Sequence, residues 1–259
     1  MKLFFKKTGE GRPLIILHGL FGLSDNWATL AKGFSENDFS VYTVDLRNHG
    51  RSPHEDSFNY DLMSEDLLAL LNEENIEKAD FIGHSMGGKV LMFFSKKYFS
   101  RINSMIVVDI APRFYPQHHQ LIVFALQSID TNSLTNRKEA EEILRTALHD
   151  EAMIHFLLKN LYWKDKDKLD WRFYLKGIVK NMEEVGQAFH SDQPIQVPAL
   201  FIRGGNSCYI NDSDENEIIK IYPLARIQTI AGAGHWVHAE QPQEFLQVCL
   251  EFLKNGGHL

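Results

Sequence analysis

Short apolar runs recur along the 259-residue chain, and each ends in glycine, aspartate or a polar turn. The runs are rich in β-branched and aromatic residues and show no alternation of apolar with polar positions. Such near-continuous apolar segments are typical of strands that are covered on both faces of a sheet. They lie near Leu3 and at residues 14–19, 41–45, 80–85, 105–109, 199–205 and 227–232.

Between several of these runs, the apolar positions recur at helical spacing instead. The segment 60–76 is the clearest case, and segments 88–98 and 244–255 show the same pattern. Strands that alternate with helices in this way predict an α/β fold with a mostly parallel, doubly wound sheet.

One interval breaks this alternation. About ninety residues separate Asp109 from Ala199, whereas a crossover between parallel strands needs only about a dozen. The pattern predicts helices over residues 136–162 and around 173–189, with a charged loop between them. We therefore expect a helical lid at residues 112–194, inserted into a core formed by residues 1–111 and 195–259.

Composition and charge narrow the classes of function. The chain is 44% hydrophobic, which is enough for a large core, and its net charge is -7 with no basic run. A nucleic-acid partner therefore has no electrostatic support. No apolar stretch reaches the length of a signal peptide or a membrane span, and Cys208 and Cys249 have no disulfide or metal-ligand spacing. We expect a cytoplasmic protein without a metal site, and no pattern indicates its oligomeric state.

The segment Gly83-His84-Ser85-Met86-Gly87 matches the pattern G-x-S-x-G, between an apolar run and a helical pattern. A nucleophile elbow requires this strand–turn–helix context, because the bend presents the serine hydroxyl above the sheet. The backbone of the bend is strained and crowded, which favours glycine on both sides. The alternative is that Ser85 only caps the following helix. The nucleophile is the better interpretation, because partners for it are also present.

A serine hydroxyl needs a general base, and His235 is the candidate. It lies in the glycine-rich turn "GAGHW" after an apolar run, so it is expected at the sheet edge where Ser85 emerges. A buried loop histidine is the alternative. The backbone N–H groups of Met86 and of Leu20, in "HGLFG", are predicted to form an oxyanion hole. His18 is expected to brace that loop.

The segments "HGLFG", "VDLRNHGRS", "GHSMGG" and "GAGHW" together resemble the α/β-hydrolase superfamily from one end of the chain to the other. Within it, "DLRNHGRSP", "VVDIAP" and "GGNS-x-Y" are similar to the YbfF-type esterases, a bacterial group related to mitochondrial α/β-hydrolase domain proteins. The resemblance implies an ester or thioester hydrolase with a helical lid and no cofactor. It also implies that Ser85 is the nucleophile and His235 the base.

The third member of the triad departs from the usual superfamily pattern. The acid commonly stands in a G-x-x-D motif, but here Ser207 occupies the position of the aspartate. Asp109 ends an earlier apolar run, and some superfamily members carry the acid at that strand end. We therefore expect Asp109 to orient His235, with Asp212 or Asp214 as alternatives. Ser207 is expected to add a hydrogen bond near His235 or Asp109.

These residues predict a serine acyl hydrolase, a carboxylesterase or thioesterase, that cleaves short-to-medium acyl esters or acyl-coenzyme A through an acyl-serine. A carbon–carbon bond hydrolase of the same fold and a non-catalytic ligand-binding receptor remain as alternatives. A coenzyme A ester would be expected to meet cations, for which Lys89, Arg113 and Arg203 are candidates. Apolar residues expected to bind the acyl substrate are Phe21, Phe114, Tyr115, Tyr209 and Trp236.

Overall fold

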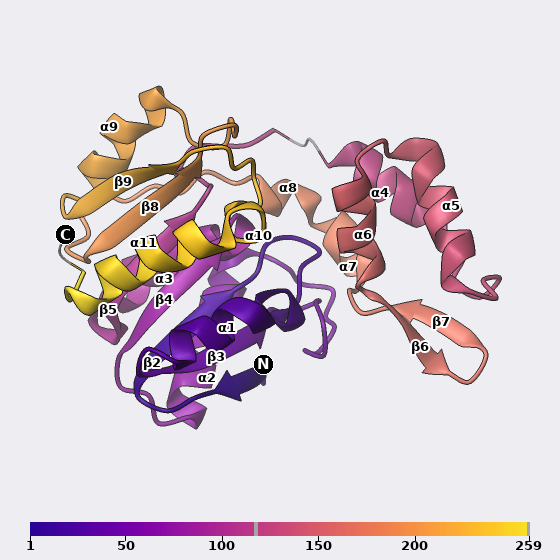
Figure 1. Ribbon diagram of the computed structural model, residues 1–259, viewed down its shortest axis with the longest axis horizontal. Coiled ribbons are helices and arrows are strands. Elements are labelled where there is room, and N and C mark those ends of the chain that lie inside the picture. Colours follow the sequence, from indigo (N-terminus) through magenta and orange to yellow (C-terminus); the bar gives the residue numbers. More distant parts are fainter. Residues whose placement is uncertain (117–118, 258–259) are drawn as a thin grey trace.

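The computed structural model describes residues 1–116 and 119–257 of the chain. Within these residues one large sheet is formed by β1 (Phe4–Thr8), β2 (Arg12–Leu17), β3 (Phe39–Asp45), β4 (Ala79–His84), β5 (Ile102–Val108), β8 (Ala199–Gly204) and β9 (Ala225–Ile230). The strand order is β1-β3-β2-β4-β5-β8-β9 (Figure 1). Strand β1 pairs antiparallel with β3, and the other neighbouring pairs are parallel. The expected mostly parallel α/β sheet is confirmed.

Helices cover both faces of this sheet. On one face lie α1 (Ala28–Ser35) and α11 (Pro242–Lys254), which pack with Leu14 and Ile16 of β2. On the other face lie α2 (Tyr60–Glu73), α3 (Met86–Tyr98) and α9 (Asp212–Ile221), which pack in one cluster with Ile15 and Leu17. All four β2 residues are fully buried, which explains why the strands carry no polar alternation.

Polar side chains set where several of these helices begin. Asn59 caps α2 by accepting a hydrogen bond from the backbone N–H of Leu62 at 2.9 Å. Asn211 caps α9 in the same way, and Asp214 accepts in return from the backbone N–H of Asn211. Short helical turns complete the core at η1 (Ser24–Trp27), η2 (Phe99–Arg101) and α10 (Val237–Glu240). No helix of the described residues combines the length and apolarity needed to cross a bilayer.

The interval between β5 and β8, called the insertion below, forms a separate group of elements beside the sheet (Figure 1). Its two ends run side by side, because Phe189 donates a backbone hydrogen bond to Pro112 at 2.7 Å and Tyr115 donates one to Gly186 at 2.8 Å. Its elements are α4 (Gln120–Gln127), α5 (Arg137–Ala147), α6 (Glu151–Leu158), β6 (Leu161–Asp165), β7 (Lys168–Trp171), α7 (Leu175–Lys180) and α8 (Met182–Val185).

Two features of the insertion differ from the sequence prediction. The helix expected over residues 136–162 is divided, because Leu148 is extended and Asp150 caps a new helix at Ala152 and Met153. The charged segment expected as a loop is the antiparallel hairpin β6–β7. Its apolar residues recur every second position, so Leu161 pairs with Trp171 across the hairpin. Charged residues lie between the apolar ones, and for this reason the alternation was not recognised as a strand pattern in the sequence.

Candidate active site

Ser85 occupies the bend between β4 and α3. Its backbone dihedral angles are φ 51° and ψ -114°, a conformation that non-glycine residues rarely adopt. A Cβ atom at Gly83 would lie 2.5 Å from the carbonyl oxygen of Gly87, and one at Gly87 would lie 2.6 Å from that of Leu17. Both flanking glycines are therefore required by close backbone contacts, as expected for a strained elbow.

His235 lies on the loop that follows β9, and Asp109 follows β5 directly. The His235 Nδ1 atom is 2.8 Å from Asp109 Oδ2, and the Asp109 side chain is fully buried. Asp109 also accepts hydrogen bonds from the Gly204 backbone N–H at 3.1 Å and from Ser207 Oγ at 2.5 Å. The buried carboxylate thus has three hydrogen-bond donors around it, and one of them is the imidazole.

The two alternative acids are engaged elsewhere. Asp212 is 91% exposed and pairs with Arg203 at 2.8 Å, at the start of α9. Asp214 belongs to the cap of the same helix and pairs with Arg113 at 3.1 Å. Within residues 1–116 and 119–257, neither carboxylate forms a hydrogen bond with His235, whereas Asp109 does.

Aromatic rings pack against the His235 imidazole. Tyr209 stacks on it with ring centroids 3.8 Å apart, and His84 lies 4.8 Å away on centroid distance. The His84 Nε2 atom is also 2.9 Å from the His235 carbonyl oxygen. Burial lowers the pKa of His84 well below its usual value, so it is a neutral packing partner at neutral pH. The contribution of His84 was not predicted, because its position inside the elbow motif carried no signal of its own.

The "HGLFG" loop runs directly against the elbow. A Cβ atom at Gly19 would lie 2.8 Å from His84 Nδ1, so the loop could not approach with a larger residue there. Among the residues that the structure describes, no acceptor is bonded to the backbone N–H of Leu20 or of Met86. Two unused donors next to Ser85 are what an oxyanion hole requires.

Two buried histidines form hydrogen bonds with the backbone of this loop. His18 accepts from the backbone N–H of Leu46 at 3.0 Å and places Nδ1 2.8 Å from the Gly19 carbonyl oxygen. His49 accepts from the backbone N–H of Phe21 at 3.1 Å. Burial lowers the pKa of His18 to about 4 and that of His49 to about 3, so both are neutral at pH 7. The bracing role expected for His18 matches its contacts, whereas His49 was not singled out.

The insertion contributes a further contact that the sequence did not reveal. Asn160, just after α6, is fully buried and donates through Nδ2 to the Phe21 carbonyl oxygen at 2.7 Å. Phe21 has φ 59°. Its backbone N–H donates to His49, and its carbonyl oxygen accepts from Asn160. The loop that carries Leu20 is fixed by both the core and the insertion.

The three cations considered for coenzyme A binding are already engaged. Lys89 is buried and donates through Nζ to the carbonyl oxygens of Pro112, Arg113 and Gln187 at 2.7–2.8 Å. It ties α3 to both ends of the insertion. Arg113 pairs with Asp214, and Arg203 pairs with Asp212.

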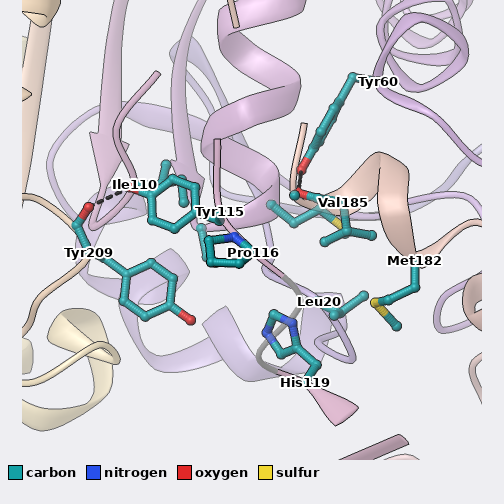
Figure 2. Close-up of a pocket in the computed structure, with 12 residues that line it drawn as sticks. Leu20, Tyr60, Ile110, Tyr115, Pro116, His119, Met182, Val185 and Tyr209 are labelled. Carbon is teal, nitrogen blue, oxygen red and sulfur yellow. Dashed lines mark hydrogen bonds between the residues drawn. The ribbon is translucent and has the colours of Figure 1, made fainter. Parts of the chain in front are cut away.

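Two cavities meet at Ser85. With the part that is open to solvent included, the Tyr60 cavity has a volume of about 420 Å³ and the Trp236 cavity one of about 940 Å³. Figure 2 shows the Tyr60 cavity, with Tyr60, Val185 and Met182 along one side and Tyr209 across from them. Residues that line both are Leu20, Ser85, His119 and Tyr209.

The residues predicted to bind substrate are distributed between these cavities. Tyr115 lines the Tyr60 cavity, Phe21 and Trp236 line the Trp236 cavity, and Tyr209 lines both. Phe114 is a correction, because its side chain is 58% exposed and lines neither cavity. Its neighbour Tyr115 turns inward, where it donates a hydrogen bond to the Tyr209 carbonyl oxygen, and so Phe114 points outward.

A metal centre has no donor set in the described segments. No group of three or more His, Cys, Asp or Glu residues in these segments is arranged to hold a metal ion.

Comparison with known proteins identifies the family. A model of the alpha/beta hydrolase fold family matches residues 12–148. Esterase YbfF of Escherichia coli (strain K12) is 37% identical over 247 residues, covering 94% of this chain and 93% of that protein. The sn-1-specific diacylglycerol lipase ABHD11 of Danio rerio is 35% identical, covering 96% and 81%. A solved structure, "Marine microorganism esterase", is 43% identical with a TM-score of 0.94, covering 97% of this chain and 99% of that one.

The chain therefore belongs to the alpha/beta hydrolase fold family. It is a hydrolase that acts on ester bonds, and the resemblance to the YbfF-type esterases is confirmed over most of its length.

Proposed function

We propose that the protein is a serine carboxylesterase in which Ser85 is the nucleophile, His235 the general base and Asp109 the orienting acid. The observation that carries the proposal is the 2.8 Å contact between His235 Nδ1 and the buried Asp109, with Ser85 and His235 on one cavity wall. A carboxylate on Nδ1 leaves Nε2 free to accept a proton and stabilises the imidazolium that forms.

The reaction takes place in two steps. His235 removes the proton from Ser85 as Oγ attacks the ester carbonyl, and the resulting oxyanion is bound by the N–H groups of Leu20 and Met86. His235 then protonates the departing alcohol, which leaves an acyl group on Ser85. A water molecule, activated by the same histidine, releases the acid. Ser207 supports the first step indirectly, because it donates a hydrogen bond to Asp109 Oδ2, the same oxygen that contacts His235, and so helps to hold the carboxylate in place.

An uncharged ester fits the site better than an acyl-coenzyme A thioester. No Lys, Arg, Asp or Glu is present among the described residues that line the two cavities. Phosphate groups are normally bound by free cations, whereas Lys89, Arg113 and Arg203 are engaged in structural contacts. We therefore assign the leaving group as an uncharged alcohol.

Hydrolysis of p-nitrophenyl butyrate by the wild type and by Ser85→Ala tests this function. Removing a serine nucleophile costs about 10⁶-fold in kcat in a comparable triad, so we expect turnover to disappear. Ser133→Ala is the control, since this serine is exposed on a turn of the insertion and should retain full turnover. Mass spectrometry of the quenched wild type should show an acyl group on Ser85.

Two results would contradict the proposal. Turnover that persists in Ser85→Ala would exclude this nucleophile. Turnover of acyl-coenzyme A in the absence of any turnover of oxyesters would assign the protein as a thioesterase instead.

A further inference from the structure

The two cavities differ in which parts of the catalytic machinery they contain. Both reach Ser85 and Leu20, but Met86 lines only the Tyr60 cavity and His235 lines only the Trp236 cavity. An ester bound with its carbonyl carbon at Ser85 Oγ therefore has one substituent in each cavity.

The chemistry of the first step decides which substituent lies where. The oxygen that leaves must be within hydrogen-bond distance of His235, because this imidazole protonates it. The acyl group carries no atom that His235 must reach, and it stays attached to Ser85 after the alcohol departs. Resting on the function proposed above, we infer that the Tyr60 cavity holds the acyl group and the larger Trp236 cavity holds the alcohol, so that the enzyme selects short acyl groups on bulky, uncharged alcohols.

The far wall of the Tyr60 cavity explains why a long acyl chain is excluded. Tyr60 is 1% exposed, and its hydroxyl donates to the Val185 carbonyl oxygen at 2.6 Å, which joins α2 of the core to α8 of the insertion. Figure 2 shows this bond closing one end of the cavity, with Met182 beside Val185. A longer acyl chain would have to displace a buried tyrosine or break this bond.

The Trp236 cavity has about twice the volume and a different lining. The insertion contributes Met153 and Phe156 from α6, and Phe156 packs against Trp236 with ring centroids 5.8 Å apart. These half-buried apolar side chains offer a contact surface for the hydrocarbon part of an alcohol. Burial lowers the pKa of His238, in the same wall, to about 3, so this imidazole is neutral at pH 7.

Octyl acetate and ethyl octanoate provide the matched test, since they are isomers with the long chain on opposite sides of the ester. Both release primary alcohols, so the chemical reactivity of the leaving group differs little. We expect kcat/KM for octyl acetate to exceed that for ethyl octanoate by at least about tenfold, since a few methylene groups in a pocket that does or does not admit them have effects of that size.

Two substitutions test the assignment of the walls. Met182→Ala opens the Tyr60 cavity and should raise kcat/KM for ethyl octanoate by about tenfold. Phe156→Ala removes an alcohol contact and should lower kcat/KM for octyl acetate by about tenfold. Met182→Phe fills the first cavity further and should reduce ethyl octanoate turnover. Trp163→Ala, on the hairpin and outside both linings, is the control that should keep the wild-type ratio.

The outcomes separate this inference from the function on which it rests. Equal or faster hydrolysis of ethyl octanoate by the wild type would overturn the assignment of the cavities. So would a Met182→Ala effect confined to octyl acetate. If Ser85→Ala hydrolysed both esters as fast as the wild type, the proposed nucleophile would be wrong while the cavity ratio would still be measurable.

Discussion

The sheet core and the insertion contribute to the active site in different ways. The core places Ser85 and Asp109 on strand-end bends with φ 51° and 50°, each held by a backbone hydrogen bond to the neighbouring strand at 2.8–2.9 Å. The insertion contributes cavity walls, from α4, α6 and α8, and it contacts the loop that carries Leu20 and Phe21 through Asn160 and Phe173. Rigid bends position the reacting atoms, whereas the surrounding walls decide which substrates fit.

The largest expected effect concerns the core. Asp109→Asn keeps the shape of the side chain but no longer holds His235 in the required tautomer, and a comparable change in a serine-protease triad lowers kcat about 10⁴-fold. We expect a loss of that order for p-nitrophenyl butyrate in steady-state assays. Asp212→Asn is the matched control and should be close to the wild type, because its carboxylate is exposed. The reverse pattern would show that the orienting acid lies in α9.

The second largest effect is expected where Lys89 of the core is bonded to the insertion. Lys89→Met removes a buried ammonium group whose three acceptors lie on the two ends of the insertion. Leaving these carbonyl oxygens without their donor should lower the free energy of unfolding by about 2 kcal/mol in urea titrations.

Lys96→Met is the control for Lys89→Met, because Lys96 also lies on α3 and donates to a carbonyl oxygen near the end of the insertion, that of His190, but is exposed. Its loss should cost less than about 0.5 kcal/mol. Equal effects of the two substitutions would show that the buried hydrogen bonds of Lys89 stabilise the fold no more than an exposed one.

A smaller effect is expected from the contact between the insertion and the loop that carries Leu20 and Phe21. Asn160→Leu removes the donor to Phe21, and the Leu20 N–H should lose its position, so kcat should fall about tenfold while KM stays nearly constant. Affinity for a trifluoromethyl ketone, which mimics the tetrahedral intermediate, should fall by the same factor. Asn181→Leu provides the comparison, since Asn181 also joins the insertion to a core carbonyl, that of Asp56, away from the loop. A change in KM alone would assign Asn160 a purely structural role.

The effect that is smallest at neutral pH is a pH dependence of stability that belongs to the core. The pKa of buried His49 is lowered to about 3, below the value of about 6.5 expected in the unfolded chain. Between these values the unfolded chain binds more protons, so stability is fully present above pH 6.5 and is lost as the pH falls. His49→Gln should reduce this loss by about 1.4 kcal/mol per pH unit in urea titrations between pH 6 and 4. An unchanged slope would show that other groups govern the acid sensitivity.

The sequence determined much of the core by itself. Strands buried on both faces have a continuous apolar pattern that local composition reveals, as in β2 and β5. The glycines around Ser85 could be interpreted from the sequence, because steric crowding at the elbow admits no larger residue there. The position of His235 at the edge of the sheet could be predicted because it follows the last strand.

Only the tertiary structure decided the remaining features, because they depend on residues far apart in the chain. Asp109 and His235 are 126 residues apart, so the sequence favoured Asp109 but left Asp212 and Asp214 as alternatives until the structure showed which carboxylate lies at the imidazole. Asn160 and Lys89 belong to no sequence motif. Each donates to backbone carbonyl oxygens, which every residue has, so no pattern of side chains indicates their partners. Phe114 and Tyr115 are both aromatic, and only the path of the chain out of β5 turns one toward solvent and the other toward Ser85.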